Sequence, residues 1–321
     1  LEKMHSGALV RMKDASFIKR ILFKFSMYLG DIAVERKLNK NFDDLLAKIL
    51  LSIGYILSFR SLRKKLGLQR AEFAASGAAP IAPEVLKFFM SIGVPLFEAY
   101  GMTENCAYAT SNSPENIKIG TVGVPAYGVE LKLADDGEIL IRSGGVFKGY
   151  FKDEQATNET IDKDGWLYTG DVGIYEGDFV KIVDRKRDII ITSGGKNVSP
   201  SEIENKIKVS PFIKEAIVIG DRRKFLSVLI GIEFDTVSNW ALRKNIPHTT
   251  YRDLSEKEEV KDLVWKEISK ANEKTSSLEV REFRMIPKEL DHEEGELTAT
   301  QKVKRNVLIE QFSDLIEEMY S

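Results

Sequence analysis

The chain has 321 residues, of which 43% are hydrophobic and 30% are charged, a balance that excludes a disordered polypeptide and predicts two or three folded domains. Lysine and arginine total 47 against 49 acidic residues, so the net charge of -2 excludes the broad positive field that attracts nucleic acid. A single cysteine excludes an intramolecular disulfide and a cysteine-based zinc cluster, and is typical of a reducing cytoplasm.

The first region, residues 1–70, carries apolar residues at helical spacing around positions 17–25 and 45–53. Its most apolar run, 49–59, holds no charge, but a bilayer-spanning helix takes about 20 residues. The run therefore predicts a buried or interfacial helix. Basic residues flank it, which leaves contact with an anionic membrane surface open beside packing against the protein: Lys48, Arg60, Arg63, Lys64 and Lys65.

Residues 71–119 alternate between strand, turn and helix. A short strand in 71–77 leads into a small-residue turn, a helix follows at 84–92, and 94–100 reads as a buried strand. This alternation predicts an α/β layer. Residues 120–184 instead contain short β-rich runs between Gly and Asp clusters, at 129–133, 138–141 and 180–183, which predict a small β-barrel or sandwich.

The remaining residues, 185–321, read as a compact α+β unit. Helices are predicted at 202–209, 255–274 and 303–320, with strands at 216–220 and 228–234. The charged run 184–188 separates this unit from the β-rich region, so we place the domain boundary there.

Four segments carry residues suited to binding anions or sugars. Ser-Gly-Ala-Ala-Pro at 76–80 lets backbone approach a flat ligand through Gly77, Ala78 and Ala79. Tyr-Gly-Met-Thr-Glu at 100–104 places a hydroxyl and a carboxylate beyond a strand end, where phosphate and Mg²⁺ bind in open α/β sheets. Read alone, the segment 76–80 is equally well explained as a tight turn. The segment 100–104 is equally well explained as an ordinary helix start with Thr103 as its cap.

The other two segments lie further along the chain. Asp171, on a predicted glycine-flanked turn, is a natural acceptor for two ribose hydroxyls, although surface turns of this kind are common. The run 184–204 contains a charged linker, an apolar strand, a double-glycine loop and a helix starting at Pro-Ser-Glu-Ile-Glu. Alone, it reads as a solvated linker and a hairpin.

In this order the four segments resemble the adenylate-forming (AMP-binding) superfamily, which includes acyl-CoA synthetases, peptide-synthetase adenylation domains and luciferases. The resemblance covers essentially the whole chain. The motifs that carry it are Tyr-Gly-x-Thr-Glu, Trp-x-x-Thr-Gly-Asp, Asp-Arg-x-(Lys/Arg)-Asp and the Gly-rich loop before Pro-x-Glu-Ile-Glu. Leu-Thr-Ala-Thr-Gln-Lys at 297–302 is similar to the ending of long-chain acyl-CoA synthetases, with Ala299 in place of the usual proline. The helical insert before residue 76 is similar to the same branch.

The resemblance implies a large AMP-binding domain over 1–184 (insert 1–70, α/β part 71–119, β-rich part 120–184) and a mobile C-terminal lid domain over 185–321. It implies that ATP activates a long-chain fatty acid to acyl-AMP, with transfer to coenzyme A. An aryl- or amino-acid-activating adenylase and a non-catalytic nucleotide-binding module remain the alternatives.

The resemblance also implies residue roles. Glu104 would hold Mg²⁺, Thr103 would contact phosphate, and Lys302 would be the adenylation lysine. The expected nucleotide contacts are Gly77, Ala78, Ala79, Tyr100, Gly101, Asp171 and Arg185. Arg187 would be the hinge of the lid, where Lys or Asp is usual, and Gly194 and Gly195 would line the CoA channel.

One motif of the superfamily has no match here: the Thr/Ser/Gly-rich loop that cradles the ATP phosphates. Together with the missing initiator methionine, this predicts the C-terminal part of a longer synthetase, impaired or inactive alone. Apolar surface exposed in such a piece would favour a homo-oligomer or a retained N-terminal fragment. We expect a cytoplasmic location, and peripheral contact with the inner face of the membrane remains an alternative.

Overall fold

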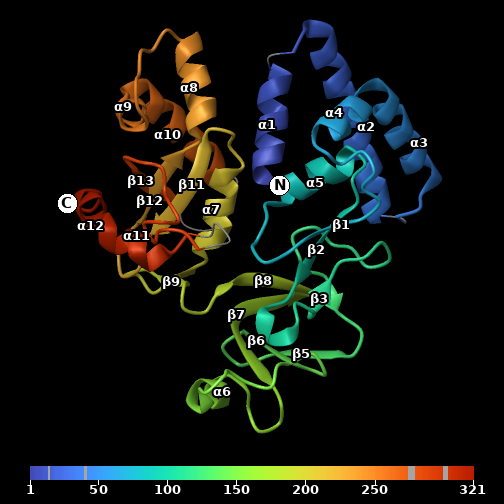
Figure 1. Cartoon of the computed structure of the whole chain (residues 1–321), viewed down its shortest axis with the longest axis vertical. Helices are drawn as coiled ribbons and strands as arrows, with labels where there is room; N and C mark the ends of the chain where they lie inside the picture. The colour runs from blue at the N-terminus through green and yellow to red at the C-terminus, as the bar shows by residue number, and fades with distance from the viewer. Residues whose placement is uncertain (14, 40–41, 274–278, 299–302) are drawn as a thin grey trace. The chain divides into compact units, whose positions relative to one another are not determined.

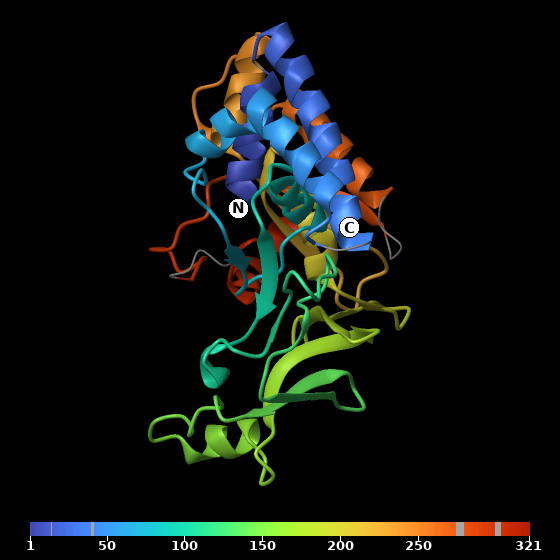
Figure 2. The same ribbon diagram turned by 90° about the vertical axis from the view of Figure 1, so that its right-hand side faces the viewer.

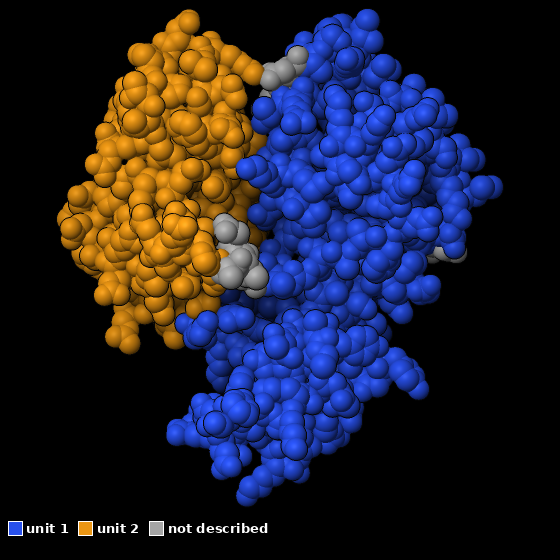
Figure 3. Space-filling view, viewed as in Figure 1, with its two compact units in different colours: residues 1–187 blue, residues 188–321 orange. Residues whose placement is uncertain are grey.

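The structure, a computed structural model, describes residues 1–13, 15–39, 42–273, 279–298 and 303–321. The chain divides into two compact units, residues 1–187 and 188–321, coloured separately in Figure 3 and labelled by element in Figure 1.

The first unit begins with helices α1 (Glu2–Lys13) and α2 (Phe17–Asn39). A continuous helical segment follows, made of α3 (Leu45–Gly54), a π-helical turn η1 (Tyr55–Phe59) and α4 (Arg60–Lys65). Asp44 caps α3 by accepting from the backbone N–H of Ala47 at 2.8 Å, and its carboxylate pairs with Arg36 of α2 at 2.8 Å. Helices α2 and α3 therefore lie side by side, as Figure 2 shows.

These helices carry apolar side chains that the described residues leave uncovered. They follow one face of each helix: Phe17, Ile18, Ile21, Phe25 and Tyr28 on α2, and Leu45, Leu46, Ile49, Ile53, Ile56 and Leu57 on α3 and η1. By length and composition the helix Leu45–Lys65 could cross a membrane, and 17% of its apolar window is buried. It exceeds the eleven-residue run noted in the sequence because the helix continues on both sides of it.

An α/β layer follows, as predicted. Strands β1 (Ala74–Ser76) and β2 (Leu96–Tyr100) pair in parallel, joined by α5 (Pro83–Ser91), and β3 (Thr110–Ser111) and β4 (Val124–Pro125) extend the sheet antiparallel. Helix α5 packs its apolar face inward: Val85, Leu86, Phe88, Phe89 and Met90 are buried. The parallel pair brings two strand ends to the same edge of the sheet.

The β-rich region is an antiparallel sheet of β5 (Val129–Leu133), β6 (Glu138–Ser143), β7 (Leu167–Glu176) and β8 (Phe179–Arg185), with α6 (Glu154–Thr160) between β6 and β7. Two backbone bonds of 2.8 Å, Val122 N–H to Val180 and Val180 N–H to Gly123, join β8 to the segment before β4. Asp184 and Arg185 still belong to β8, so this part of the predicted charged linker is strand.

The second unit is built on the sheet β11 (Ile213–Ile219), β12 (Leu226–Ile232) and β13 (Val280–Met285). Helices α7 (Pro200–Lys208), α8 (Phe234–Arg243), α9 (Tyr251–Glu256) and α10 (Glu258–Asn272) contribute to one apolar core, while α11 (Arg305–Gln311) and α12 (Ser313–Glu318) contribute to a second. The hairpin β9 (Ile190–Ile191) and β10 (Asn197–Val198) precedes α7.

Two predicted helices are each split. The helix expected at 255–274 breaks at Lys257, whose ψ of 132° is extended, so α9 and α10 are separate helices. The one expected at 303–320 consists of α11 and α12, separated at Phe312. Helix α1 lies within the region 1–70 that was predicted to be helical, whereas helices α6 and α8 and strand β13 had not been predicted.

Candidate functional site

The first predicted segment lies at the edge where β1 and β2 end together. Ser76 pairs with Glu98 across the two strands, and Gly77 passes so close to the carbonyl oxygen of Ala99 that a Cβ there would come within 2.9 Å. Ala78 follows with a φ of 66°, in the left-handed region. The turn is thereby held against β2, with Gly77, Ala78 and Ala79 exposed.

The second segment continues directly from β2 into the short 3₁₀ turn Thr103–Asn105. Gly101 is required before it, because a Cβ would lie 2.2 Å from the backbone carbon of Ala107. The buried Asn105 side chain accepts the backbone N–H of Met102 at 2.9 Å and fixes the turn. Thr103 is consequently exposed and Glu104 half-buried, both beyond the strand end.

Glu104 has a partner that the sequence interpretation missed. The Tyr150 hydroxyl donates to Glu104 Oε1 at 2.9 Å, and the backbone N–H of Phe147 donates to the Glu104 carbonyl at 2.7 Å. Burial and the neighbouring carboxylate raise the pKa of Tyr150. The sequence signal for this contact was the Gly149-Tyr150 pair after β6, because a glycine before an aromatic residue can mark a special turn. In the structure Gly149 indeed has a φ of 145°.

Asp171 lies inside strand β7, so the prediction of a glycine-flanked turn was wrong. The hydroxyl of Thr169, two residues earlier on the same strand, donates to the carbonyl of Ile139 on β6 at 2.7 Å. The Tyr100 hydroxyl donates to Asp171 Oδ2 at 2.5 Å, and Arg185 Nε lies 3.6 Å from Oδ1. The structure thus brings together three of the predicted nucleotide contacts.

The part of β7 that carries Asp171 is also tied to the end of the first unit. The buried carboxylate of Glu138 accepts the Gly170 N–H at 2.9 Å through one oxygen and Lys186 Nζ at 2.8 Å through the other. Lys186 also pairs with Asp136 at 2.6 Å, and both acids raise its pKa. The predicted hinge residue, Arg187, follows at once and is exposed.

In the second unit, Gly194 and Gly195 form the predicted loop between β9 and β10. The Thr192 N–H donates to the Lys196 carbonyl at 3.1 Å and closes the loop, and Gly195 has a φ of 75°. A Cβ at either glycine would meet open space. The loop leads into α7, where Ser199 caps the helix as the sequence pattern indicates.

Lys302 lies outside the described residues. The residues on either side are placed: Leu297 bridges Val303, and the Lys304 N–H donates to the Glu296 carbonyl at 2.8 Å. Arg305, next along, bonds Glu204 of the Pro-x-Glu-Ile-Glu motif at 2.6 Å. The segment just after the 297–302 ending is therefore in contact with the Pro-x-Glu-Ile-Glu motif within this unit.

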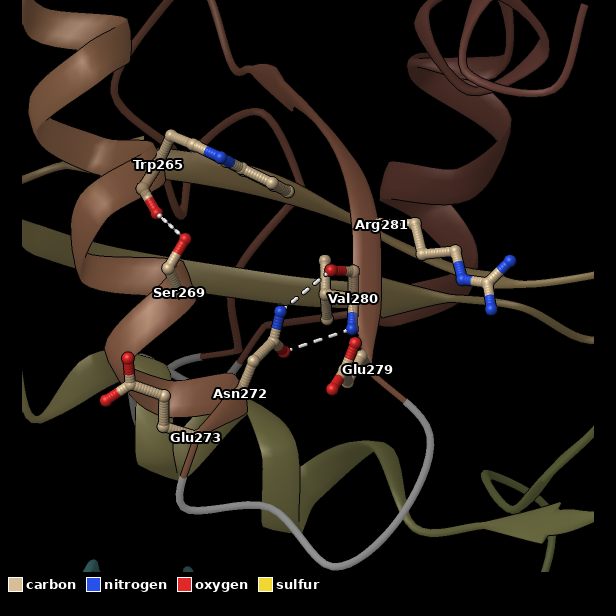
Figure 4. Close-up of a pocket in the computed structure, with 7 residues that line it drawn as sticks. All are labelled: Trp265, Ser269, Asn272, Glu273, Glu279, Val280 and Arg281. Carbon is tan, nitrogen blue, oxygen red and sulfur yellow. Dashed lines mark hydrogen bonds between the residues drawn. The ribbon is translucent and has the colours of Figure 1, made fainter.

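A hollow of about 410 Å³ lies beside α10 and β13 (Figure 4). Its residues are Trp265, Ser269, Asn272, Glu273, Glu279, Val280 and Arg281. The Asn272 side chain bonds both the N–H and the carbonyl of Val280, at 3.1 and 2.9 Å, and so starts strand β13. The contact is a structural anchor for the strand.

Comparison with known proteins agrees with this arrangement. Residues 34–151 match the family described as AMP-binding enzyme, and residues 187–321 match the AMP-binding enzyme C-terminal domain. The chain is 38% identical over 268 residues to the long-chain-fatty-acid–CoA ligase FadD15 of Mycobacterium bovis, covering 83% of this chain and 44% of the relative. It is 30% identical to the long-chain-fatty-acid–CoA ligase ACSBG2 of Xenopus laevis, covering 99% and 46%.

Among solved structures, the adenylation domain of a carboxylate reductase from Mycobacterium chelonae superposes with a TM-score of 0.65. That match has 22% sequence identity and covers 95% of this chain and 46% of the other, so it shows the fold alone. The chain spans a little under half the length of the relatives it matches. With two matching domains in the expected order, it belongs to the AMP-binding enzymes, the adenylate-forming superfamily.

Proposed function

We propose that this chain provides the nucleotide-binding part and the C-terminal domain of an AMP-forming long-chain fatty-acid–CoA ligase. The observation that carries the proposal is the cluster of Tyr100, Asp171 and Arg185 beside the strand end that presents Thr103 and Glu104. The curated relatives, named long-chain-fatty-acid–CoA ligases, support the substrate class. They favour neither an aryl- or amino-acid-activating adenylase nor a non-catalytic module.

The proposed chemistry has two steps. A fatty-acid carboxylate attacks the α-phosphate of ATP, which forms acyl-AMP and releases pyrophosphate. The thiolate of coenzyme A then attacks the acyl carbon and releases AMP. The first step converts a poor acyl donor into a mixed anhydride with a good leaving group, and the charge that builds on the phosphate calls for fixed cations.

Within this scheme Asp171 accepts the ribose hydroxyls and Arg185 contacts ribose or phosphate. The exposed turn Gly77, Ala78 and Ala79 lines the adenine and acyl pocket beside Tyr100 and Gly101, and Thr103 contacts phosphate. Lys302 supplies a point charge to the α-phosphate and the substrate carboxylate. Arg187 serves as the hinge, and Gly194 and Gly195 line the CoA channel.

Glu104 fits the role of a Mg²⁺ ligand. No group of three His, Cys, Asp or Glu side chains suited to a metal occurs in the described ranges, but Mg²⁺ is commonly held by one or two carboxylates together with substrate phosphates. Its oxygen that accepts from Tyr150 is held in place before any ligand arrives. Bound there, Mg²⁺ would neutralise charge on the phosphates.

The measurement that tests the proposal is ATP–pyrophosphate exchange with Mg²⁺ and a long-chain fatty acid, with acetate as the control acid. We expect weak exchange or none from this chain alone, because no phosphate-cradling loop is present in its sequence. Any exchange should depend on the long-chain acid and vanish in Lys302→Ala. Where exchange is absent, AMP binding decides: binding weakened by Asp171→Ala supports the site, and no AMP binding contradicts it.

We also propose that the protein works in the cytoplasm and touches the inner face of the membrane through the exposed face of α2 and α3. Support comes from the charge of the helical segment, because residues 45–71 contain no acidic residue while Arg60, Lys64 and Lys65 are exposed. A second copy of the chain or a retained N-terminal fragment are the competing occupants of this face. Binding to anionic vesicles, described below, separates them.

A further inference from the structure

One hydrogen bond connects the two sheets of the first unit at the candidate nucleotide site. Tyr100 ends β2 and Asp171 lies in β7, 71 residues further along the chain, and the Tyr100 hydroxyl donates to Asp171 Oδ2 at 2.5 Å. The two residues are only 8% and 9% exposed. Such a bond from a hydroxyl to a carboxylate is among the stronger hydrogen bonds in proteins.

The Tyr100 ring itself belongs to the apolar core of the first unit. It packs with Ala109, Ile139, Ile141 and Val180, all nearly inaccessible to solvent. Little of the ring surface is therefore available to a ligand, and its polar end points at Asp171. The Tyr100 hydroxyl is therefore placed to affect nucleotide binding through that carboxylate.

We infer that Tyr100 is a positioning residue, whose hydroxyl holds the Asp171 carboxylate in the orientation that accepts a ribose. This inference rests on the proposed function, because it takes Asp171 as the acceptor of the ribose hydroxyls. It assigns the Tyr100 hydroxyl a role separate from any contact of the ring with adenine.

The physical reason for this role is the rotational freedom of the aspartate carboxylate. Rotation about its terminal torsion is broad, so a carboxylate without a fixed partner samples many orientations. Fixing it before binding removes part of the ordering cost that the ligand would otherwise meet. Arg185 is less suited to this task, since its side chain is 54% exposed and its Nε lies 3.6 Å away.

The hydroxyl also remains a donor across the working pH range. Burial, followed by the nearby charge of Asp171, raises the pKa of Tyr100 well above its usual value. The phenol therefore stays protonated, and the bond to Asp171 persists in alkaline solution.

The test compares AMP with 2′,3′-dideoxy-AMP by isothermal titration calorimetry on the 321-residue chain. Tyr100→Phe keeps the ring and removes the hydroxyl. We expect it to weaken AMP binding about tenfold while leaving the dideoxy nucleotide unchanged. In an Asp171→Ala background the same substitution should add no further loss, since the group it positions is gone.

A matched control is Tyr175→Phe. Tyr175 lies on the same strand as Asp171, and its hydroxyl donates to the Leu131 carbonyl at 3.1 Å, away from the site. It should leave both affinities unchanged. Thermal unfolding of each variant would show that the fold is retained.

Three results would overturn the inference alone: equal losses for both nucleotides in Tyr100→Phe, no loss for AMP, or additive losses in the double variant. Equal losses would mean that Tyr100 contributes packing only. Failure of the proposed function looks different. The parent chain would then bind neither nucleotide, or Asp171→Ala would bind AMP as well as the parent, and the inference would fall with it.

Discussion

Glu98 is an acid on an otherwise apolar strand, and its surroundings control its charge. It lies on β2 between Phe97 and Ala99, and the Gly120 N–H donates to its Oε2 at 3.3 Å. Burial raises the pKa of Glu98 to about 7, and the bond from Gly120 offsets only part of this effect. The side chain therefore takes up a proton near neutral pH.

This property predicts a stability change in Glu98→Gln. The folded pKa lies above the usual value of 4.5, so the native state binds the extra proton between about pH 4.5 and 7. The contribution to stability is complete below pH 4.5 and is lost as the pH rises through 7. The glutamine variant avoids that loss, and should be more stable than the parent at pH 8 by up to about 3 kcal/mol.

Urea unfolding at pH 5 and pH 8 would measure it. The control is Glu130→Gln, an exposed site where Arg142 lowers the carboxyl pKa, so its contribution changes only in acid below this window. An equal drop in stability between the two pH values for the parent and Glu98→Gln would contradict the prediction.

At the scale of elements, the start of α11 is fastened to α7 by a largely buried ion pair. Arg305 Nη2 donates to Glu204 Oε1 at 2.6 Å and its Nη1 to the Val218 carbonyl at 2.9 Å, while the Val218 N–H donates to the same Glu204 oxygen at 2.7 Å. The two charged side chains are 19% and 14% exposed. The contact joins two helices and strand β11.

Glu204→Ala should therefore lower the free energy of unfolding of the second unit by about 3 kcal/mol, because it leaves the arginine buried without its carboxylate. The matched control is Glu202→Ala, two residues earlier on α7. It removes only the surface pair with Lys206 and should cost about 0.5 kcal/mol or less. Chemical denaturation followed by circular dichroism measures both, and equal losses would rule out a special role for the buried pair.

The elements that could be predicted from the sequence are those determined by residues close together in the chain. The periodic helices α2, α3 and α7 are determined by neighbouring residues, and the sequence interpretation found them. The split at Lys257 and the strand position of Asp171 depend on backbone angles and pairing that local composition does not show.

The same distinction applies to the candidate site, where some features were predictable from the sequence and others were not. The motifs identified its principal residues one by one, but the bonds Tyr100–Asp171 and Tyr150–Glu104 span 71 and 46 residues. Contacts across such distances are set by sheet pairing. The sequence pattern therefore located the groups and left their partners undetermined.

At the scale of the molecule, exposed apolar side chains gather on one face of α2, α3 and η1, where an ordinary protein surface is mixed. Ile56 of the adjoining turn η1 is 79% exposed, so a substitution there should not disturb the core. Ile56→Glu should abolish binding to vesicles rich in phosphatidylglycerol, because it places a negative charge against an anionic surface. The control Tyr127→Glu, at a 97% exposed site, should leave binding intact.

Vesicle sedimentation with neutral phosphatidylcholine as the comparison measures this effect. If the parent chain does not bind anionic vesicles, the membrane proposal is contradicted. If Ile56→Glu converts a dimer to a monomer in analytical ultracentrifugation, the occupant of the face is a second copy.

The last two helices have a consequence for synthesis of the chain. Leu308, Phe312, Ile316 and Met319 pack on Ile217, Leu229 and Ile286 of the second unit, so α11 and α12 cover one side of its sheet. A ribosome holds the most recent few dozen residues in its exit tunnel, so this side of the sheet stays open until α11 and α12 have left the tunnel. A nonsense mutation in the codon of Arg305 would release a protein whose sheet is uncovered on one side, a substrate for chaperones and proteases.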